Sequence, residues 1–500
     1  MIVEQYGITI EGLDIDVPVT ITIEHETTRV YTVLIPPISE PTRLLLNDIR
    51  NAIVPSIATM QTEQGLREAR ELRQQLLSVI EKEVAARIGS VPEGTRKFLV
   101  LSLLNDMTGL GDLEYLLADP NLEEIVVPAA MENVMVYHRK HGWLHSNITI
   151  RTEDQVLNYA SIIARRVSRE ISVLKPILDA RLTTGDRANA VLYPIANRGN
   201  TMTIRKFARD PWTCVDFIKN GTCTAHIFAL LWVAIQYEMN VLFSGGTATG
   251  KTSMLNVCLP FVPPNQRIIS IEDTRELQLP DFLFWEPLVT RQPNPEGKGE
   301  VDMLDLLITS LRMRPDRIVM GEVRRGDHAT VLFEAMHTGH SVYATLHADT
   351  IQETVHRLVN PPISIPANLL DAVHLCVVMF RDRRKSLRRV YQIGEFVGSK
   401  EGGEHLIRPN VLYRYSATED AIVPHAQSVV VMDKLCQHLG CAVKDIETEI
   451  AQRESILNWL VRHEVRGITA FARVMELFYG NPTKVIEAAR KDVPPGELLK

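Results

Sequence analysis

The chain has 500 residues, of which 45% are hydrophobic, 23% charged and 6% aromatic. This composition is that of an ordinary globular protein and excludes collagen, a coiled coil and wholesale disorder, while the length predicts about three domains. The 54 Lys and Arg against 61 Asp and Glu give a net charge of −7, which disfavours non-specific wrapping of nucleic acid.

The sequence shows no sign of export or of a membrane span. The start, Met-Ile-Val-Glu-Gln, lacks the basic and apolar regions of a signal peptide. The most apolar run, 227–235, is far shorter than the roughly 20 residues that cross a bilayer. The six cysteines are scattered without a Cys-x-x-Cys pair, so we expect reduced thiols, no structural zinc and a cytoplasmic protein.

The first 207 residues mix strands and helices. Runs rich in Val, Ile and Thr predict strands at 6–10, 17–23 and 30–35. Apolar residues at helical spacing predict helices over 62–87 and 97–107. From about 111 the pattern becomes a mixed α/β segment, with a helix at 153–169 and strands at 124–127, 134–138, 143–145, 189–192 and 201–205.

Between 214 and 398, short apolar runs alternate with helical patterns. This alternation predicts a largely parallel sheet in a three-layer arrangement. The expected strands are 240–243, 267–271, 317–320 and 341–345. After Gly403 we expect the chain to return to helix, with amphipathic runs at 447–464 and 470–478.

The decisive motif follows the strand expected at 240–243 and fits the pattern G-x-x-x-x-G-K-[ST] of a phosphate-binding loop. Its residues are Gly245, Gly246, Thr247, Ala248, Thr249, Gly250, Lys251 and Thr252, with Ser253 opening the next helix. The glycines let backbone N–H groups converge on phosphate oxygens, and the helix N-terminus adds partial positive charge. We predict Lys251 on the β- and γ-phosphates and the Thr252 hydroxyl on Mg²⁺; a glycine-rich turn with a solvated lysine is the alternative.

Carboxylates end two other expected strands. Glu322 follows the strand at 317–320, where it can orient Mg²⁺ or an attacking water. Glu272 and Asp273 end the strand at 267–271, and Glu276 follows in the next turn. Strand carboxyl ends lie beside the phosphates in an open α/β sheet, so one of these acids is a candidate general base. The sequence leaves open whether it is Glu272, Glu276 or Glu322, and a capped turn is the alternative for 272–276.

Two histidines, His340 and His347, flank the strand expected at 341–345. No cysteine or tight histidine pair accompanies them, so a zinc site is disfavoured. We predict a polar sensor of the γ-phosphate in this segment, with a buried core histidine as the alternative for each residue.

In this order, the four segments resemble the secretion-superfamily ATPases, the motors of type II secretion, type IV pili, conjugation-type secretion and archaeal surface filaments. The resemblance is strong over about 111–398, and the flanks resemble the archaeal branch. The family's Walker A loop, Asp box, Walker B and His box match residues 245–252, 272–276, 318–322 and 340–347. The resemblance implies a homo-hexamer that hydrolyses ATP with Mg²⁺, is recruited to the inner face of the cell membrane and works on a polytopic membrane platform.

The resemblance also implies a fold class: α/β, with a RecA-like P-loop ATPase core, an N-terminal α/β domain and a small β/helical N-terminal extension. The expected segments are an extension at 1–110, an N-terminal domain at 111–207, a linker at 208–213, the core at 214–400 and a C-terminal helical region at 401–500. In the family, arginines of the N-terminal domain reach the phosphates, and Arg187 and Arg205 match them. A surface ion pair is the alternative for each arginine.

Three departures from the family pattern stand out. Thr249 replaces the usual serine before Gly-Lys, and Arg324-Arg325-Gly326 lengthens the segment after Gly-Glu-Val. The tetracysteine zinc module of bacterial secretion and pilus-extension members is missing, which argues against that branch.

Two other functions compete with a mechanochemical ATPase. A nucleic-acid motor would use the basic stretch 381–389, but no aromatic residue is interleaved there, so we expect a polar turn between strands at 372–380 and 390–396 and no bound nucleic acid. A non-catalytic, nucleotide-dependent adaptor is disfavoured because every polar group expected in the site is retained.

Overall fold

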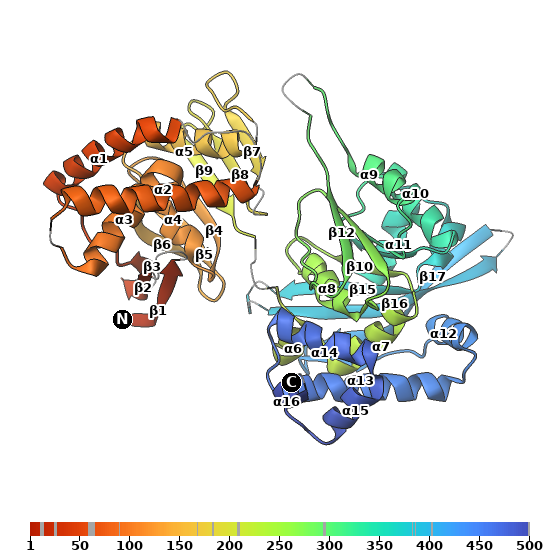
Figure 1. The fold of residues 1–500 in the computed structure, drawn as a ribbon. Coiled ribbons are helices and arrows are strands. Elements are labelled where there is room, and N and C mark those ends of the chain that lie inside the picture. Colours follow the sequence, from red (N-terminus) through yellow and green to blue (C-terminus); the bar gives the residue numbers. More distant parts are fainter. Residues whose placement is uncertain are drawn as a thin grey trace. The chain divides into compact units, whose positions relative to one another are not determined.

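A computed structural model describes residues 1–10, 15–24, 28–58, 66–89, 91–167, 169–182, 185–207, 211–293, 297–382, 384–385, 387–401 and 404–498. The chain forms two compact units, Met1–Arg209 and Asp210–Lys500 (Figure 1). The division falls inside the expected linker 208–213, of which 208–210 lie outside the described residues. The division of the chain into the five expected segments, each with its own function, stays a prediction.

The first unit contains a nine-stranded sheet in the order β1-β2-β3-β6-β5-β4-β9-β8-β7 among its described residues. Its strands are β1 (Ile2–Ile10), β2 (Ile15–Glu24), β3 (Thr28–Val33), β4 (Leu122–Val127), β5 (Asn133–His138), β6 (Gly142–Thr149), β7 (Ile177–Arg181), β8 (Arg187–Val191) and β9 (Thr201–Arg205). Its helices are α1 (Glu40–Ala58), α2 (Leu66–Arg87), α3 (Glu93–Thr108), α4 (Leu113–Ala118) and α5 (Glu153–Arg166).

The N-terminal extension and the segment from 111 share one sheet and one core. β3 pairs in parallel with β6, which joins the hairpin β1–β2 and β3 to the remaining strands. Tyr6 and Tyr31 both donate to the buried carboxylate of Asp119 at 2.6 Å, which ties the first strands to the turn after α4. Apolar side chains from β1 to β9 and all three long N-terminal helices pack into the same core.

Most elements of this unit were expected from the sequence. The strands at 6–10, 17–23 and 30–35 and the helices at 97–107 and 153–169 are confirmed within a few residues. The helix expected at 62–87 is present from Leu66, and its first expected residues lie outside the described ones. Helix α1 and strand β7 were not expected from the sequence.

In the second unit, the residues that the structure describes form another nine-stranded sheet, in the order β12-β11-β13-β14-β10-β15-β16-β17-β18. Its strands are β10 (Val241–Gly245), β11 (Arg267–Glu272), β12 (Phe284–Val289), β13 (Arg317–Met320), β14 (Ser341–Leu346), β15 (Leu375–Asp382), β16 (Leu387–Glu401), β17 (Glu404–Ser416) and β18 (Ala421–Pro424). Its helices are α6 (Cys214–Lys219), α7 (Ala225–Gln236), α8 (Lys251–Cys258), α9 (Met303–Ser310), α10 (Gly326–His337), α11 (Ile351–Val359), α12 (Val431–Leu439), α13 (Val443–Arg462), α14 (Ile468–Gly480), α15 (Pro482–Arg490) and α16 (Pro495–Leu498), with 3₁₀ turns η1 (Leu259–Phe261) and η2 (Ala367–Ala372).

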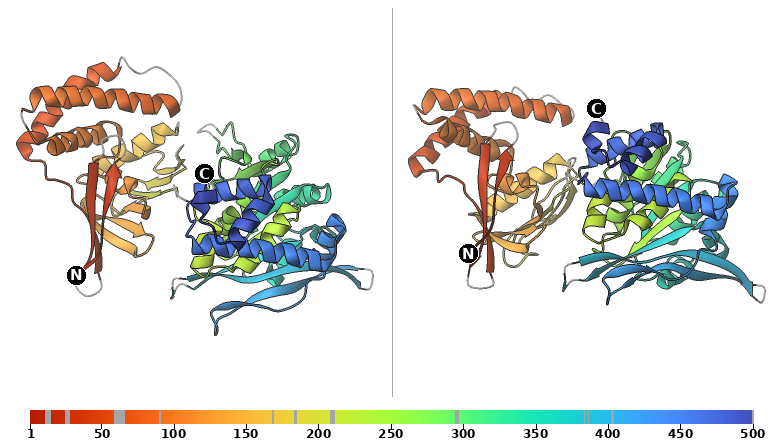
Figure 2. Two further views of the ribbon diagram at one scale, coloured as in Figure 1. Left: turned by 60° about the horizontal axis from the view of Figure 1, so that its bottom comes forward. Right: turned by 90° about the horizontal axis from the view of Figure 1, so that it is seen from below.

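Helices cover both faces of the parallel part of this sheet (Figures 1 and 2). On one face α7, α8 and the C-terminal helices pack in one apolar cluster, and on the other α9, α10 and α11 pack in a second. Strands β10, β13 and β14 are therefore buried along their whole length, as their continuous apolar runs predicted. The α/β class is confirmed, with β10 between β14 and β15 in the parallel part of the sheet. Among the described residues, no helix combines the length and apolarity needed to cross a membrane.

The expectation of helix directly after Gly403 is wrong. Residues 404–416 and 421–424 form β17 and β18, which extend the sheet in antiparallel fashion from β16. The apolar residues Val411, Tyr413 and Tyr415 recur at a period of two, which is the spacing of a strand. Helix resumes at α12, and the helices expected at 447–464 and 470–478 are confirmed as α13 and α14.

A fully buried carboxylate, Glu395 of β16, joins this antiparallel extension to the C-terminal helices. It accepts hydrogen bonds from Asn410 Nδ2 and Ser428 Oγ, each at 2.8 Å, and from three successive backbone N–H groups that lead into α12. A carboxylate at a helix N-terminus satisfies N–H groups that have no partner in the helix. Glu395 therefore holds the turn between β18 and α12.

Replacing this carboxylate should destabilise the second unit. We expect Glu395→Ala to lower its free energy of unfolding by about 3 kcal/mol, because several buried donors lose their acceptor. Denaturant midpoints from circular dichroism measure the effect, with Glu476→Ala, an exposed glutamate of α14, as the matched control. Equal midpoints for the two variants would contradict the role given to Glu395.

Candidate functional site

The phosphate-binding loop begins where β10 ends, in the middle of the sheet. Gly245 pairs with Met379 of β15 and has a φ of 144°, a conformation that favours glycine. A Cβ on Gly245 would lie 2.5 Å from the carbonyl oxygen of Met379. Only a glycine lets the loop leave the sheet so close to the neighbouring strand.

The other end of the loop starts α8. Gly250, with a φ of 95°, caps the helix in a left-handed conformation, and Lys251 is its first residue. The Lys251 side chain is buried and its Nζ donates to the carbonyl oxygen of Gly246 at 2.9 Å, so it folds back over the loop. Burial lowers the pKa of the Lys251 ammonium. Thr252 and Ser253 occupy the same first turn, half-buried and exposed respectively.

The Glu272 carboxyl lies at the same edge of the sheet, at the end of β11. Its Oε1 accepts the backbone N–H groups of Glu276 and Leu277 at 2.8 and 3.1 Å. Its Oε2 is buried and has no hydrogen-bond partner among the described residues. Burial raises the pKa of Glu272 to about 7. A buried carboxyl with one free oxygen and a pKa near neutrality is suited to accept a proton from water.

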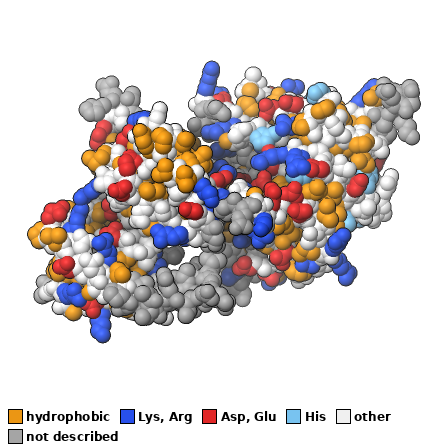
Figure 3. All heavy atoms as spheres, turned by 90° about the horizontal axis from the view of Figure 1, so that it is seen from above, with side chains coloured by type: hydrophobic (Ala, Val, Ile, Leu, Met, Phe, Trp, Pro, Cys, Tyr) orange, Lys and Arg blue, Asp and Glu red, His pale blue; other side chains and the backbone are white. Residues whose placement is uncertain are grey.

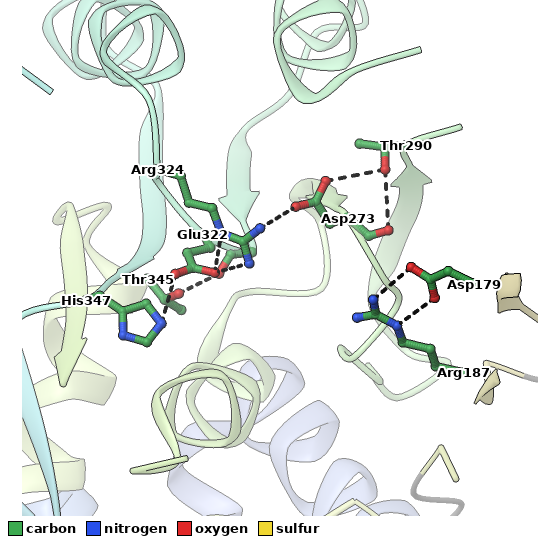
Figure 4. A network of polar contacts seen from close by, with 9 residues as sticks. Asp179, Arg187, Asp273, Thr290, Glu322, Arg324, Thr345 and His347 are labelled. Atoms are coloured by element: carbon green, nitrogen blue, oxygen red, sulfur yellow. Dashed lines mark hydrogen bonds and ion pairs between the residues drawn. The ribbon is translucent and has the colours of Figure 1, made fainter. Parts of the chain in front are cut away.

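Glu322, just after β13, is held between a histidine and an arginine (Figure 4). His347 Nε2 lies 3.0 Å from Glu322 Oε1. Arg324 donates to Glu322 Oε2 through Nε at 2.8 Å and through Nη2 at 2.5 Å. Burial, and then the nearby charge of Lys251, lower the pKa of His347, so a neutral imidazole that donates its Nε2–H suits this contact.

The same arginine reaches the turn after β11. Arg324 Nη1 lies 3.2 Å from Asp273 Oδ2, and Asp273 also accepts from the Thr290 hydroxyl at 3.4 Å (Figure 4). Thr345, near the end of β14, donates to the carbonyl oxygen of Gly321. The strand ends that carry Asp273, Glu322 and His347 are thus linked side chain to side chain. Glu276 is exposed and contributes its backbone N–H to Glu272.

His340 is not brought to this edge. It precedes β14, whereas His347 follows it, so about 20 Å of strand separates them at ~3.3 Å per residue. The His340 ring contacts the carbonyl oxygen of Ala335 and the hydroxyl of Thr338 at the end of α10. His340 therefore lies at the opposite end of β14 from His347, and its role at the site stays a prediction.

The two predicted arginines lie in the first unit and are neighbours across its sheet. Arg187 of β8 pairs directly with Arg205 of β9, and on the other side with Arg181 of β7. Arg187 also makes a bidentate ion pair with Asp179, at 3.1 and 2.9 Å (Figure 4). An ion pair of this kind is the alternative to a phosphate-binding role that the sequence left open for Arg187. On its other side Arg205 lies opposite Glu124 of β4, and a role of the two arginines at the phosphates stays a prediction.

Three contacts of the second unit were not foreseen from the sequence. Arg324 links the two acidic strand ends, as described above. Asp349 lies against the loop, since a Cβ on Gly246 would be 2.8 Å from its Oδ1. Arg388 of β16 donates from Nε to the carbonyl oxygen of Ala248 at 3.3 Å. Asp349 follows the His box by two residues. No local sequence pattern pointed to Arg388, because β16 comes close to the loop only through the pairing of β10 with β15 and of β15 with β16.

These residues fit a nucleoside triphosphate with Mg²⁺. The loop has the two left-handed glycines and the buried lysine that a phosphate cradle requires. The Thr252 hydroxyl and the Glu322 carboxylate are hard oxygen donors of the kind that Mg²⁺ prefers. The free Oε2 of Glu272 is a buried acceptor that a water molecule at the site would satisfy.

Comparison with known proteins places the chain among secretion proteins. The family model described as "Type II/IV secretion system protein" matches residues 107–454. An uncharacterized protein of Methanocaldococcus jannaschii is 34% identical over 399 residues, which cover 79% of this chain and 71% of that protein. The type IV secretion system protein PtlH of Bordetella pertussis is 31% identical over 244 residues, 44% of this chain and 72% of PtlH. The solved Legionella pneumophila ATPase DotB is 18% identical with a TM-score of 0.39, over 76% of this chain and 94% of DotB.

The raised pKa of Glu272 predicts a pH-dependent stability. In the fold its pKa is about 7, against about 4.3 in an unfolded chain, so the fold favours the protonated acid. This contribution is fully present below pH ~4.3 and is lost as the pH rises through ~7. Relative to the natural chain, Glu272→Gln should therefore be more stable at pH 8 than at pH 5, by about 2–3 kcal/mol.

Denaturant midpoints at the two pH values measure this difference. Glu476→Gln, which removes an exposed carboxylate of α14, serves as the control. A Glu272→Gln variant whose relative stability is the same at pH 5 and pH 8 would show that this carboxyl is not held in its protonated form.

Proposed function

The chain belongs to the type II/IV secretion system protein family, and we propose that it is a motor that hydrolyses ATP to ADP and phosphate. One observation carries the proposal. Four strand ends of one parallel sheet bring together a phosphate-binding loop with Lys251, the buried acid Glu272, and the linked pair Glu322 and His347. This is the set of groups that binding and hydrolysis of a nucleoside triphosphate require.

In the proposed reaction the loop and Lys251 hold the phosphates. The Lys251 ammonium exchanges its hydrogen bond to Gly246 for one to the β- and γ-phosphates, and the N–H groups at the start of α8 complete the cradle. Thr252 and Glu322 would hold Mg²⁺, Glu322 through water; when bound, the ion neutralises charge that develops on the phosphates.

We assign the general base to Glu272. Its free Oε2 can accept the proton of an attacking water, and a pKa of about 7 leaves it substantially ionised at neutral pH. Glu322 has both oxygens engaged, by His347 and by Arg324, which suits a positioning role. His347 reports the γ-phosphate through its contact with Glu322.

The proposal extends to assembly and place of action. We propose a cytoplasmic homo-hexamer, recruited to the inner face of the membrane, that drives a filament of the type IV pilus or archaellum kind or a type II-like secretion process through a polytopic membrane platform. Arg187 and Arg205 would complete the site at the phosphates. The family match supports the general class of machine.

The contacts of the basic stretch support a turn in place of a nucleic-acid surface. Asp382 accepts the backbone N–H groups of Arg384 and Lys385, and Arg389 forms a bidentate pair with Asp420. Arg383 lies outside the described residues. On the face shown in Figure 3, acidic and basic side chains are interspersed.

Removing the lysine of the loop should abolish turnover. We expect Lys251→Ala to weaken binding of ATP in the presence of Mg²⁺ by about 10- to 100-fold, because a charge-assisted hydrogen bond contributes about 1.5–3 kcal/mol. Phosphate release and calorimetry measure the two effects. Lys484→Ala, an exposed lysine of α15, is the control; ATP turnover that persists in Lys251→Ala would refute the proposed function.

Substitutions of Glu272 and of Glu322 should affect different kinetic properties. We expect Glu272→Gln to lower kcat about 100-fold or more with little change in ATP affinity, and the natural kcat to rise with pH through about 7 as Glu272 ionises. Glu322→Gln should instead raise the Mg²⁺ concentration needed for half-maximal rate. If the pH dependence survives in Glu272→Gln, the base is another residue.

A further inference from the structure

The guanidinium of Arg324 occupies the carboxylate that the proposed function assigns to Mg²⁺. Two of its nitrogens, Nε and Nη2, lie 2.8 and 2.5 Å from Glu322 Oε2, while Oε1 faces His347 Nε2 at 3.0 Å. A carboxylate oxygen has about two lone-pair sites, so two N–H groups of one guanidinium fill those of Oε2. A metal ion, or a water molecule bound to it, can use this oxygen only after the guanidinium has moved.

The path of the backbone after β13 makes Glu322 and Arg324 neighbours. They stand on either side of Val323, which is buried and whose N–H donates to the carbonyl oxygen of Thr345 at 2.9 Å. In a segment that follows a neighbouring strand in this way, side chains two residues apart project from the same side. The arginine is therefore held where it competes for the glutamate.

A second acid offers Arg324 another position. Its Nη1 lies 3.2 Å from Asp273 Oδ2, at the end of β11, which pairs with β13. The other oxygen of Asp273, Oδ1, accepts from the Thr290 hydroxyl at 3.4 Å, which leaves Oδ2 for the arginine (Figure 4).

The two ends of this contact differ in their freedom to move. The Arg324 side chain is 60% exposed, whereas that of Glu322 is 18% exposed. The arginine can therefore turn from Glu322 toward Asp273 and solvent without loss of buried packing, while the glutamate stays in place. The geometry thus describes one cation shared between two acids, of which only Glu322 is assigned to the metal.

We propose that Arg324 regulates metal binding at this site: it competes with Mg²⁺ for Glu322 and, when ATP binds together with Mg²⁺, gives up Glu322 and stays on Asp273. The inference rests on the proposed function, in which Glu322 holds the ion through water. Repulsion between the guanidinium and the ion acts in the same direction as the competition. Arg324 is a positioning residue in this account, since it acts through Glu322.

The test measures binding of ATP in the absence of turnover data. Calorimetry gives the Kd of ATP for the natural full-length chain and for Arg324→Gln, once with Mg²⁺ and once with EDTA. We expect Arg324→Gln to bind ATP about five-fold more tightly with Mg²⁺ and equally well in EDTA, because an ion pair with an exposed partner contributes about 1 kcal/mol. Arg324→Lys keeps the charge without the planar fork and should fall between the two.

Two double variants test whether the effect passes through the acids. In a Glu322→Gln background, Arg324→Gln should no longer tighten binding with Mg²⁺, because the group for which the two cations compete is gone. Asp273→Asn alone should weaken binding with Mg²⁺, since Arg324 loses its second acid and stays on Glu322. The same substitution in an Arg324→Gln background should have no effect.

Arg473→Gln, which removes an exposed arginine of α14, is the matched control. Three results would overturn the competition: an Arg324→Gln variant whose affinity with Mg²⁺ is unchanged or lower, a gain that survives in the Glu322→Gln background, or a loss of affinity in EDTA, which would mean that Arg324 binds phosphate directly. A natural chain that binds no ATP with Mg²⁺ would instead overturn the proposed function, and the competition with it.

Discussion

The parallel alignment of β12, β11, β13, β14, β10 and β15 is the constraint on which the site depends. Parallel strands end at the same edge of a sheet, so residues far apart along the chain become neighbours there. Gly245, Glu272, Glu322 and His347 are brought together in this way. The alignment itself is maintained because helices bury both faces of the sheet in two separate apolar clusters.

Several charged groups at this edge have hydrogen-bond partners within the fold. Lys251 uses a carbonyl oxygen of its own loop, and Glu322 is paired with Arg324. Burial raises the pKa of Glu272 to about 7, so this carboxyl is only partly ionised at neutral pH. Under the proposed function, a triphosphate would replace the carbonyl oxygen of Gly246 as the partner of Lys251.

The charged groups described above are divided between the two units. The second unit holds the phosphate-binding loop and the acids at the strand ends, and the first holds Arg181, Arg187 and Arg205 side by side across β7, β8 and β9. Asp179 pairs with Arg187, and Glu124 of β4 lies opposite Arg205. The N-terminal strands β1–β3 belong to the same sheet as these arginines.

The sequence by itself determined the local features of this protein. The loop 245–252, most strands and long helices, and the acids at strand ends could be read from it, because each depends on a spacing of a few residues. The tertiary structure alone decided which of these residues meet. It separated His340 from His347 by the length of β14, turned 404–424 into sheet through pairing with β16, and placed Arg324 between Glu322 and Asp273. It also set Arg388 beside the loop, since strand order and burial are long-range properties that no short stretch of sequence encodes.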